Sequence, residues 1–323
     1  MSLKFVIGRA GSGKSRYCLD EVRQRLKEDP AGPPLILLVP EQATFQAEYE
    51  LVTTPGLKGT MRAQAISFRR LAYRVMQECG GTARIHIDET GKQMLLYKIL
   101  QAHKEELTIF GRAAEQQGFV AELNELFTEF RRYNQSAKDL EEIYTRAVRR
   151  KMAGADSVQD MRGSEEHSEE QTKEHSENHR IDHSKDHDEA VNPFAHKLQD
   201  LKLIYSKFEE QLAGHYIDSE DYLQTLADQA MQSAYLRDSE LWIDGFTGFT
   251  PQEFAVIAQL MRSVKRVTMT LCLDRPYEPG ETLNELNLFY NTAVTMVRMK
   301  ELAEQFGVAI EPVVQLPVRP RRF

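Results

Sequence analysis

The glycine-rich stretch between Gly8 and Ser15 constrains the fold more than any other part of this sequence. It reads GRAGSGKS and matches the phosphate-binding pattern G-x-x-x-x-G-K-[ST]. In such a loop, backbone N–H groups and the following helix N-terminus bind a polyphosphate, the lysine reaches its terminal phosphates, and the last hydroxyl ligates Mg²⁺. The predicted nucleotide-binding residues are therefore Gly8, Arg9, Ala10, Gly11, Ser12, Gly13, Lys14 and Ser15, and Ser15 is also a predicted metal ligand.

The residues on either side of this loop have the pattern that the motif requires. Residues 3–7 are typical of a short strand, and residues 15–28 place Leu19, Val22 and Leu26 at helical spacing. An ordinary glycine-rich turn is the alternative, but it does not explain a strand directly before the loop and a helix directly after it. The stretch predicts a nucleotide site with ATP and Mg²⁺ as ligands.

Strand-like and helix-like segments alternate near both ends of the chain. Residues 35–39 form an uninterrupted apolar run, as expected of a strand that is buried on both faces of a parallel sheet. The alternation predicts an α/β protein with a parallel sheet. Further predicted strands span residues 61–66, 241–244, 267–273 and 308–310, and the predicted helices end near Leu51 or span residues 68–77, 251–262 and 282–305.

The middle of the chain interrupts this alternation with sequence of helical character. Strong helix formers dominate residues 89–133, and residues 119–130 have an amphipathic pattern. Further helices are predicted for residues 137–150 and 193–212. We therefore predict an α/β core of residues 1–83 and 239–315, an inserted helical subdomain of residues 84–238, and a tail of residues 316–323 at an expected truncation point.

Residues 152–190 differ in composition from the rest of the insertion. Glu, His, Ser and Asp dominate this segment, which is too poor in large apolar groups to offset its ordering entropy, so we expect it to be disordered. Its histidines recur every four residues, but a solvated insertion explains this composition better than a metal site. These histidines are His175, His179, His183 and His187.

The net charge of −8 does not exclude a nucleic-acid partner. Residues 151–190 contain twelve acidic and five basic residues, so the rest of the chain is almost neutral and can still contain a local cationic groove.

The sequence has no paired cysteines, no membrane-spanning run and no signal peptide, and these absences guide the expected compartment and cofactors. Cys18, Cys79 and Cys272 are far apart and form no Cys-x-x-Cys pair, so they suggest neither a disulfide framework nor a zinc or iron–sulfur site. No apolar run approaches the roughly 20 residues that cross a bilayer, and the N-terminus enters a strand directly instead of a signal peptide. We expect a cytoplasmic protein without a membrane partner.

Asp244 is the natural Mg²⁺ partner of Ser15, because it ends an apolar strand far from the loop in sequence. A plain strand-ending acid is the alternative interpretation. In helicase-like ATPases a glutamate follows this aspartate and activates water, whereas this chain has Gly245 there and no base in the next three residues. We therefore expect ATP binding without fast hydrolysis, and we assign no catalytic residue.

Several separate segments resemble the N-terminal region of AddB, the B subunit of the bacterial AddAB helicase–nucleases. In order, they are GRAGSGKS at residues 8–15, LLVPEQATF at residues 37–45, RAQAISF at residues 62–68 and WIDGFTGFTPQEF at residues 242–254.

This resemblance implies a P-loop NTPase fold of the RecA-like, superfamily 1 helicase type that no longer translocates along DNA. It also implies a role in double-strand-break repair by homologous recombination, in which the module scans single-stranded DNA at DNA ends for Chi-type hotspots. The implied partner is the AddA subunit, which supplies the motor. The family's C-terminal exonuclease domain and its 4Fe–4S cluster have no counterpart in these 323 residues.

The same resemblance implies a set of DNA-binding residues on loops that leave the strands. Single-strand readers need flat rings for bases, cations for phosphates, and amides or hydroxyls for base edges. The implied residues are Gln42, Thr44, Phe68, Arg70, Tyr73 and Phe246, with Tyr73 where a tryptophan is familiar. Core packing is the alternative for Phe68, a solvated surface for Arg70 and Tyr73, and the start of a helix for Gln42 and Thr44.

Two other functions are compatible with the motif. One is a free-standing P-loop phosphotransferase or active ATPase whose helical insertion forms a lid with Arg131 or Arg132. The other is a structural arm that keeps the loop only for stability.

Overall fold

The computed structural model describes residues 1–54, 62–80, 85–113, 116, 118–146, 193–218 and 221–317. Contacts divide the chain into an α/β unit and a helical unit. The α/β unit comprises Met1–Asp88, Arg132–Asn134 and His215–Phe323, and the helical unit comprises Glu89–Arg131 and Gln135–Gly214. No helix in these described ranges is long and apolar enough to cross a membrane.

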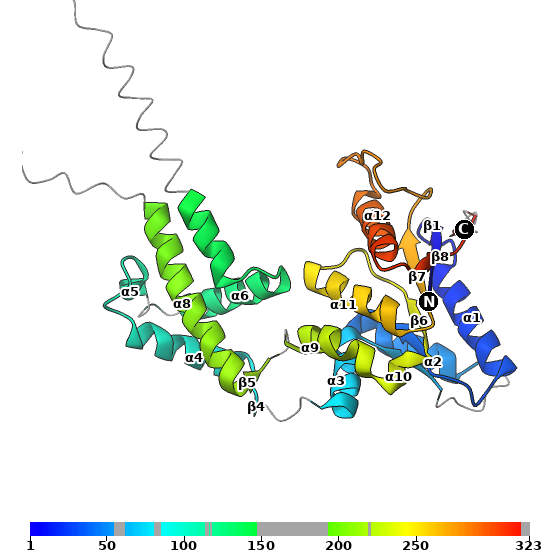
Figure 1. Cartoon of the computed structure of the whole chain (residues 1–323), viewed down its shortest axis with the longest axis horizontal. Helices are drawn as coiled ribbons and strands as arrows, with labels where there is room; N and C mark the ends of the chain where they lie inside the picture. The colour runs from blue at the N-terminus through cyan, green and yellow to red at the C-terminus, as the bar shows by residue number, and fades with distance from the viewer. Residues whose placement is uncertain are drawn as a thin grey trace, which may run out of the picture. The chain divides into compact units, whose positions relative to one another are not determined.

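A parallel sheet forms the centre of the α/β unit (Figure 1), which confirms the predicted class. Its strands lie in the order β3-β2-β6-β7-β1-β8, and β9 pairs with the second half of β1. The strand that precedes the glycine loop, β1, is thus separated from β6 by β7 alone. The strands are β1 (Ser2–Gly8), β2 (Leu35–Leu38), β3 (Ala63–Ile66), β6 (Glu240–Ile243), β7 (Arg266–Cys272), β8 (Ala309–Ile310) and β9 (Val314–Gln315).

Apolar side chains on both faces of the sheet are buried, as predicted for residues 35–39. Leu35 and Leu37 of β2 belong to one core cluster, and Ile36 and Leu38 belong to another. This division follows from the alternation of side chains along a strand. Helices α1 (Lys14–Glu28) and α2 (Thr44–Val52) contribute to the first cluster. Helices α3 (Phe68–Cys79), α9 (Asp221–Gln229), α10 (Ala234–Arg237), α11 (Pro251–Ser263) and α12 (Tyr290–Gln305) contribute to the second.

Two of the helix starts are capped by side chains next to them in the sequence. The Ser67 hydroxyl accepts the backbone N–H of Arg70 at the start of α3. Thr250 and Glu253 form a reciprocal capping box at the start of α11, with Pro251 at the first helical position. These caps fix where the chain turns from the sheet into the helices.

The helix predicted for residues 282–305 is wrong over its first eight residues. Helix α12 begins only at Tyr290, because side chains upstream form local turns instead. Asn284 accepts the backbone N–H of Leu286, and Asn287 accepts that of Phe289. Asparagine competes with helix formation in this way.

Residues 215–238, which the sequence places with the helical insertion, pack in the α/β unit. Leu226, Ala230 and Leu236 belong to the same core cluster as α3 and α11. The Glu78 carboxylate accepts the Ser233 hydroxyl at 2.6 Å, which fastens the start of α10 to the end of α3. A short parallel pair, β4 (Ile85–His86) and β5 (Tyr216–Ile217), closes this region. Its short strands have no alternation long enough to predict.

The helical unit has an aromatic core. The Phe127 ring lies 4.8 Å from the ring of Tyr205 and 5.7 Å from that of Phe208. The buried Asp200 carboxylate accepts the backbone N–H groups of residues 108–110, which are otherwise unpaired at a helix start. The helices are α4 (Glu89–Ala102), α5 (Phe110–Ala113), α6 (Phe119–Arg132) and α8 (Pro193–His215), and residues 137–146 are also helical.

The predictions of disorder and of a histidine stripe for residues 152–190 lie outside the described residues. Among the residues that are described, no group of three or more His, Cys, Asp or Glu side chains is placed to hold a metal ion. The three cysteines are free thiols. Burial, with Asp244 and Glu21 nearby, raises the pKa of the Cys18 thiol, as expected for a structural cysteine.

Candidate nucleotide site and nucleic-acid groove

The glycine loop joins β1 to α1 with a backbone that only glycine adopts easily. Gly11 and Gly13 have positive φ angles of 78° and 96°, which are left-handed conformations that strain other residues. A Cβ on Gly8 would lie 2.5 Å from the Ser12 hydroxyl oxygen. The Lys14 ammonium donates to the carbonyls of Gly8 and Arg9 at 2.9 and 3.0 Å, so its charge is held against the loop backbone. Within the part of the chain that the structure describes, the buried Ser12 hydroxyl has no hydrogen-bond partner.

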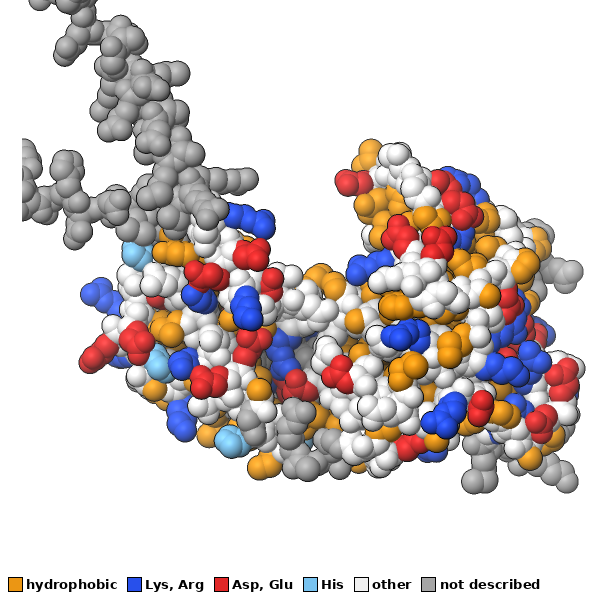
Figure 2. Space-filling model, viewed as in Figure 1, with side chains coloured by type: hydrophobic (Ala, Val, Ile, Leu, Met, Phe, Trp, Pro, Cys, Tyr) orange, Lys and Arg blue, Asp and Glu red, His pale blue; other side chains and the backbone are white. Residues whose placement is uncertain are grey.

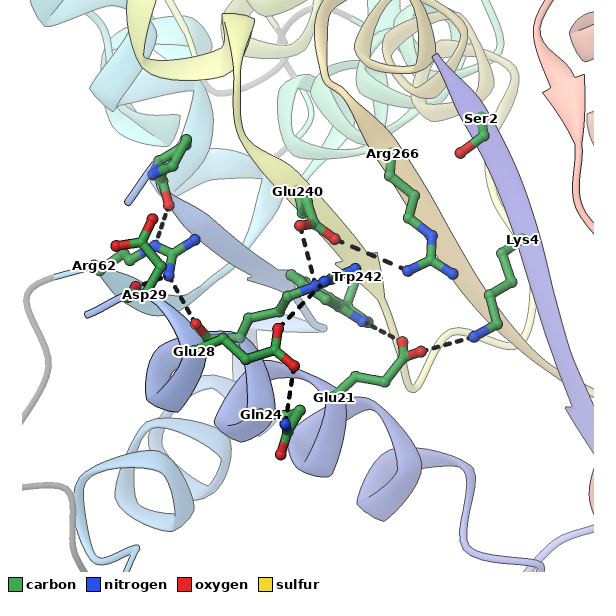
Figure 3. Close-up of polar contacts among 12 residues, drawn as sticks. Ser2, Lys4, Glu21, Gln24, Glu28, Asp29, Arg62, Glu240, Trp242 and Arg266 are labelled. Carbon is green, nitrogen blue, oxygen red and sulfur yellow. Dashed lines mark hydrogen bonds and ion pairs between the residues drawn. The ribbon is translucent and has the colours of Figure 1, made fainter. Parts of the chain in front are cut away.

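A buried polar network holds α1, and therefore the loop before it, against the sheet. In Figure 3 the Glu21 carboxylate of α1 lies between Lys4 of β1 and Trp242 of β6. It accepts the Lys4 ammonium at 2.7 Å and the Trp242 indole N–H at 3.0 Å. Burial alone raises the pKa of Glu21, but these two donors outweigh it and the net pKa is lowered. The charged carboxylate therefore stabilises the position of α1.

Asp244 leaves the carboxyl end of β6 and faces the same region. Its side chain is 8% exposed, and its Oδ1 atom accepts the Thr270 hydroxyl of β7 at 2.5 Å. Since β7 lies between β1 and β6, this hydrogen bond orients the carboxylate from the neighbouring strand. The backbone N–H of Asp244 donates to the Leu38 carbonyl of β2.

Ser15 and Asp244 line one cavity of about 290 Å³, which we call the Ser15 cavity. The sequence predicts that these two side chains come together, and the structure brings them to the same cavity. A hydroxyl and a carboxylate are oxygen donors of the kind that Mg²⁺ prefers. The donor types in the Ser15 cavity therefore fit a Mg²⁺ ion.

Gly245 follows Asp244, at the position where a helicase motor is expected to have a water-activating glutamate. Its φ angle is 84°, and a Cβ there would lie 3.4 Å from the Pro40 ring. This backbone is unfavourable for glutamate. The sequence reveals no replacement, but the structure places Glu50 of α2 in the lining of the Ser15 cavity. The Glu50 carboxylate accepts the Gln46 side-chain amide at 3.0 Å.

A second cavity, of about 660 Å³, lies beside α3; we call it the Tyr73 cavity. Tyr73 is 52% exposed and Arg70 is largely exposed, with its guanidinium 4.0 Å from the Glu48 carboxylate. Both predicted DNA-binding side chains therefore face an open space. The other lining residues are Glu41, Gln64, Ile66, Arg69, Arg74, Gln77, His86 and Tyr222.

A third cavity, of about 520 Å³, contains Phe246 and Phe68 in its lining; we call it the Phe246 cavity. Phe246 is half-buried, and its ring meets that of Phe68 edge-on at 5.6 Å. Phe68 is only 7% exposed and belongs to the core cluster, so the Phe246 ring packs against a core residue. Both cavities share Glu41, Arg69 and Tyr222 in their linings, which makes them neighbours at the carboxyl edge of the sheet. Ligands bind at this edge in open α/β sheets.

The remaining two predicted DNA-binding residues lie in and after the short turn η1 (Glu41–Ala43). Gln42 is exposed, whereas Thr44 is buried and its hydroxyl donates to the Glu41 carbonyl at 2.8 Å. Thr44 therefore stabilises the turn at the start of α2, which agrees with the alternative interpretation that it starts a helix. Gln42 is the accessible residue of the two.

On the face drawn in Figure 2, acidic and basic side chains are intermingled over the α/β unit. This distribution agrees with the nearly neutral charge of the chain outside residues 151–190. Arg69, Arg70 and Arg74 are gathered locally in the lining of the Tyr73 cavity.

A family model described as "ADDB, N-terminal" matches residues 5–162 and 155–323. The chain belongs to the AddB N-terminal family.

Curated relatives agree with this assignment, and each is named as the B subunit of an ATP-dependent helicase/deoxyribonuclease. The chain is 43% identical over 321 residues to the relative from Geobacillus kaustophilus and 44% identical over 320 residues to that from Heliobacterium modesticaldum. It is 43% identical over 323 residues to the relative from Desulforudis audaxviator. These alignments cover 99–100% of the chain but only 23–24% of the relatives, so the chain spans about a quarter of their length.

The structure adds residues that sequence patterns did not indicate. Arg69 and Tyr222 lie where the two cavities meet, although they are far apart in the sequence. Thr270 and Glu50 adjoin Asp244 from a neighbouring strand and a neighbouring helix. A cationic site could have been inferred from three arginines on one predicted helix, Arg69, Arg70 and Arg74. No local pattern in the sequence indicated Tyr222 or Thr270.

Proposed function

We propose that the α/β unit is a P-loop NTPase domain of the RecA-like, superfamily 1 helicase type that binds ATP and single-stranded DNA. The observation on which this rests is that the Ser15, Tyr73 and Phe246 cavities lie along one carboxyl edge of one parallel sheet. The strand order supports it, since β7 alone separates the loop-bearing strand from the aspartate-bearing strand.

In this proposal the glycine loop holds the phosphates of ATP and two side chains hold Mg²⁺. The left-handed glycines turn the backbone so that N–H groups are available to an anion. Lys14 contributes positive charge, and the unpartnered Ser12 hydroxyl is a further donor. Ser15 and Asp244 are the metal ligands, and Thr270 keeps the Asp244 carboxylate in place.

The groove formed by the Tyr73 and Phe246 cavities binds the DNA. Tyr73 and Phe246 offer ring faces to bases, and Arg70 offers charge to a phosphate. The amides of Gln42, Gln64 and Gln77 can contact base edges, which makes recognition of a sequence such as Chi chemically possible.

The family relation supports the biological setting of this proposal. The names of the relatives speak of an ATP-dependent helicase, a deoxyribonuclease and a subunit of a larger assembly. We propose that this chain acts within such an assembly, with AddA as the motor subunit, on DNA ends during double-strand-break repair and homologous recombination. Nuclease activity would belong to a part of the family's proteins that this chain does not span.

The decisive experiment separates DNA binding from ATP binding. In the double variant Phe246→Ala/Arg70→Ala, we expect affinity for a fluorescent single-stranded oligonucleotide to fall about tenfold or more, since each stacked base is worth about 1–3 kcal/mol. ATP–Mg²⁺ binding, followed by the rise in melting temperature, stays as in the parent chain. Arg16→Ala is a matched control, because Arg16 is an exposed arginine of α1 outside both cavities. Unchanged DNA affinity in the double variant would defeat the proposal.

An active ATPase is the second candidate, and Glu50 is the observation that favours it. Its carboxylate lines the same cavity as Ser15 and Asp244, so it is the available candidate for a general base there. If so, the chain alone hydrolyses ATP and Glu50→Gln abolishes turnover without weakening ATP binding. If the parent chain binds ATP but turns it over no faster than Glu50→Gln, this candidate is excluded.

A further inference from the structure

The Tyr73 cavity has a second side that none of the predicted DNA-binding residues occupies. Helix α3 contributes Arg70 and Tyr73 to the lining, which also includes His86 from β4 and Tyr222 from α9. Arg69 belongs to the linings of both the Tyr73 and the Phe246 cavity. These three side chains come from segments up to 153 positions apart in the sequence, and only the fold collects them.

His86 and Tyr222 present two aromatic rings in nearly parallel planes. Their centroids are 6.1 Å apart and their planes differ by 24°. His86 is exposed and Tyr222 is half-buried, so the ring pair is anchored on one side and open on the other. An ordinary packing contact between a strand and a helix would account for the ring pair, but not for its position in the lining of an open cavity with three arginines.

The backbone around this ring pair is well fixed. Strand β4 pairs with β5, and the Ile87 N–H extends this pairing by donating to the Ile217 carbonyl. The Asp218 and Asp221 carboxylates each accept the backbone N–H of the other residue, which defines the start of α9 immediately before Tyr222. A backbone that is already held by hydrogen bonds lowers the entropy cost of binding a ligand to these rings.

The electrostatic surroundings indicate that a guanidinium is close to Tyr222. Burial raises the pKa of the Tyr222 hydroxyl, and the positive charge of Arg69 opposes part of this rise. Cations beside aromatic faces are the combination that binds the phosphates and bases of a single strand. Three arginines, Arg69, Arg70 and Arg74, outnumber the two glutamates in the lining of the Tyr73 cavity, which leaves a positive balance for an anionic strand.

The two cavities together also favour a polymer over a free nucleotide. Their volumes are about 660 and 520 Å³, and both include Arg69 and Tyr222 in their linings. Rings are present in both, namely Phe246 in one and Tyr73 with the His86–Tyr222 pair in the other. A chain of nucleotides can place a phosphate at the junction and a base in each cavity.

We propose that Tyr222 and His86 form an additional base-stacking site and that Arg69 binds the phosphate between the two cavities. A single DNA strand then passes from Phe246 across Arg69 to the rings of Tyr73, Tyr222 and His86. This inference rests on the proposed function, because it extends the same DNA groove.

The test measures affinity of the 323-residue chain for a fluorescent single-stranded oligothymidine and for a duplex of the same length. Tyr222→Leu and His86→Ala each weaken single-strand binding about tenfold and leave duplex binding unchanged, because paired bases cannot stack on the rings. Tyr222→Phe keeps the ring and binds within about twofold of the parent. Arg69→Ala lowers the slope of log affinity against log salt by about 0.7, the contribution of one phosphate contact on a single strand.

Controls separate this inference from the proposed function. Tyr97→Leu removes a tyrosine that is 52% exposed, as Tyr73 is, but that lies outside both cavities, and it leaves binding unchanged. The exposed position of His86 means that His86→Ala keeps the melting temperature even if Tyr222→Leu does not.

If Tyr222→Leu and His86→Ala bind like the parent while Phe246→Ala/Arg70→Ala loses affinity, the additional site is wrong and the proposed function stands. If Phe246→Ala/Arg70→Ala also binds like the parent, both fail. Equal losses in Tyr222→Phe and Tyr222→Leu overturn stacking on Tyr222.

Discussion

Polar side chains have opposite roles in two regions of the α/β unit, the face of the sheet that α1 covers and the carboxyl edge of the same sheet. On the α1 face, the Glu21 carboxylate is paired with the buried side chains of Lys4 and Trp242. At the carboxyl edge, Asp244, Arg70 and Tyr73 line cavities that are open to a ligand. The first arrangement contributes to folding free energy and the second leaves binding capacity, so substitutions in the two regions are expected to separate stability from function.

The α1 face of the sheet should show the largest loss of stability, on substitution of Trp242. This side chain is 1% exposed, packs in the α1 core cluster and donates its indole N–H to Glu21. We expect Trp242→Ala to lower the free energy of unfolding by about 3–5 kcal/mol, as for other buried aromatic residues. Urea denaturation measures this, and a loss below about 1 kcal/mol would contradict the role of the network.

Lys14→Ala should have the converse effect at the carboxyl end. Its ammonium contacts only backbone carbonyls of the loop in the described structure, so we expect the stability of the ligand-free chain to change by less than about 0.5 kcal/mol. ATP–Mg²⁺ at about 100 times its Kd should stabilise the parent by about 2.7 kcal/mol, and the variant by far less. Thermal unfolding with and without ATP–Mg²⁺ measures both quantities. Lys27→Ala, at an exposed site on the same helix, is the control and keeps the full stabilisation.

Glu21→Gln tests the charge of the network on the α1 face. We expect a loss of about 1–3 kcal/mol at neutral pH, since Lys4 and Trp242 lose a charged acceptor. The pKa of Glu21 is lowered from 4.5 in the folded state, so its contribution is present above that unfolded value and disappears as the pH falls through the folded pKa. Parent and variant should therefore converge in stability in acid. A difference that stays constant from about pH 7 to below about pH 4 would rule out an ionised Glu21. Glu28→Gln, at an exposed end of α1, gives the background.

Thr270→Val is the smallest and most specific change. It removes the hydroxyl that donates to Asp244 while keeping the shape of a buried residue of β7. We expect ATP–Mg²⁺ to bind about tenfold more weakly, and ATP without Mg²⁺ to bind as in the parent, because outer partners of metal ligands are worth about 10–100-fold in affinity. Calorimetric titrations with Mg²⁺ and with EDTA separate the two. Equal weakening in both would mean that Thr270 supports the fold and not the metal ligand.

The sequence predicted the elements that surround the glycine loop because interactions between neighbouring residues determine these elements. Short apolar runs specify β1 and β2, a capping box specifies the start of α11, and the glycines of the loop have the positive φ angles for which glycine is suited. The same reasoning failed at residues 282–289, where asparagine turns outweigh helical character. It also missed β4 and β5, whose two-residue strands depend on pairing between distant segments.

What the sequence determined by itself is the chemistry that is contiguous in the chain: the phosphate-binding motif, the strand-ending Asp244, the missing glutamate at Gly245 and the AddB family relation. Only the tertiary structure decided which distant groups share a cavity, such as Ser15 with Asp244 and Glu50, or Arg69 with Tyr222. It also decided that Thr44 and Phe68 are buried whereas Gln42, Arg70 and Tyr73 are accessible. The physical reason is that a motif needs only neighbouring residues to be recognised, whereas burial and cavity lining depend on how parallel strands from both ends of the chain are ordered in one sheet.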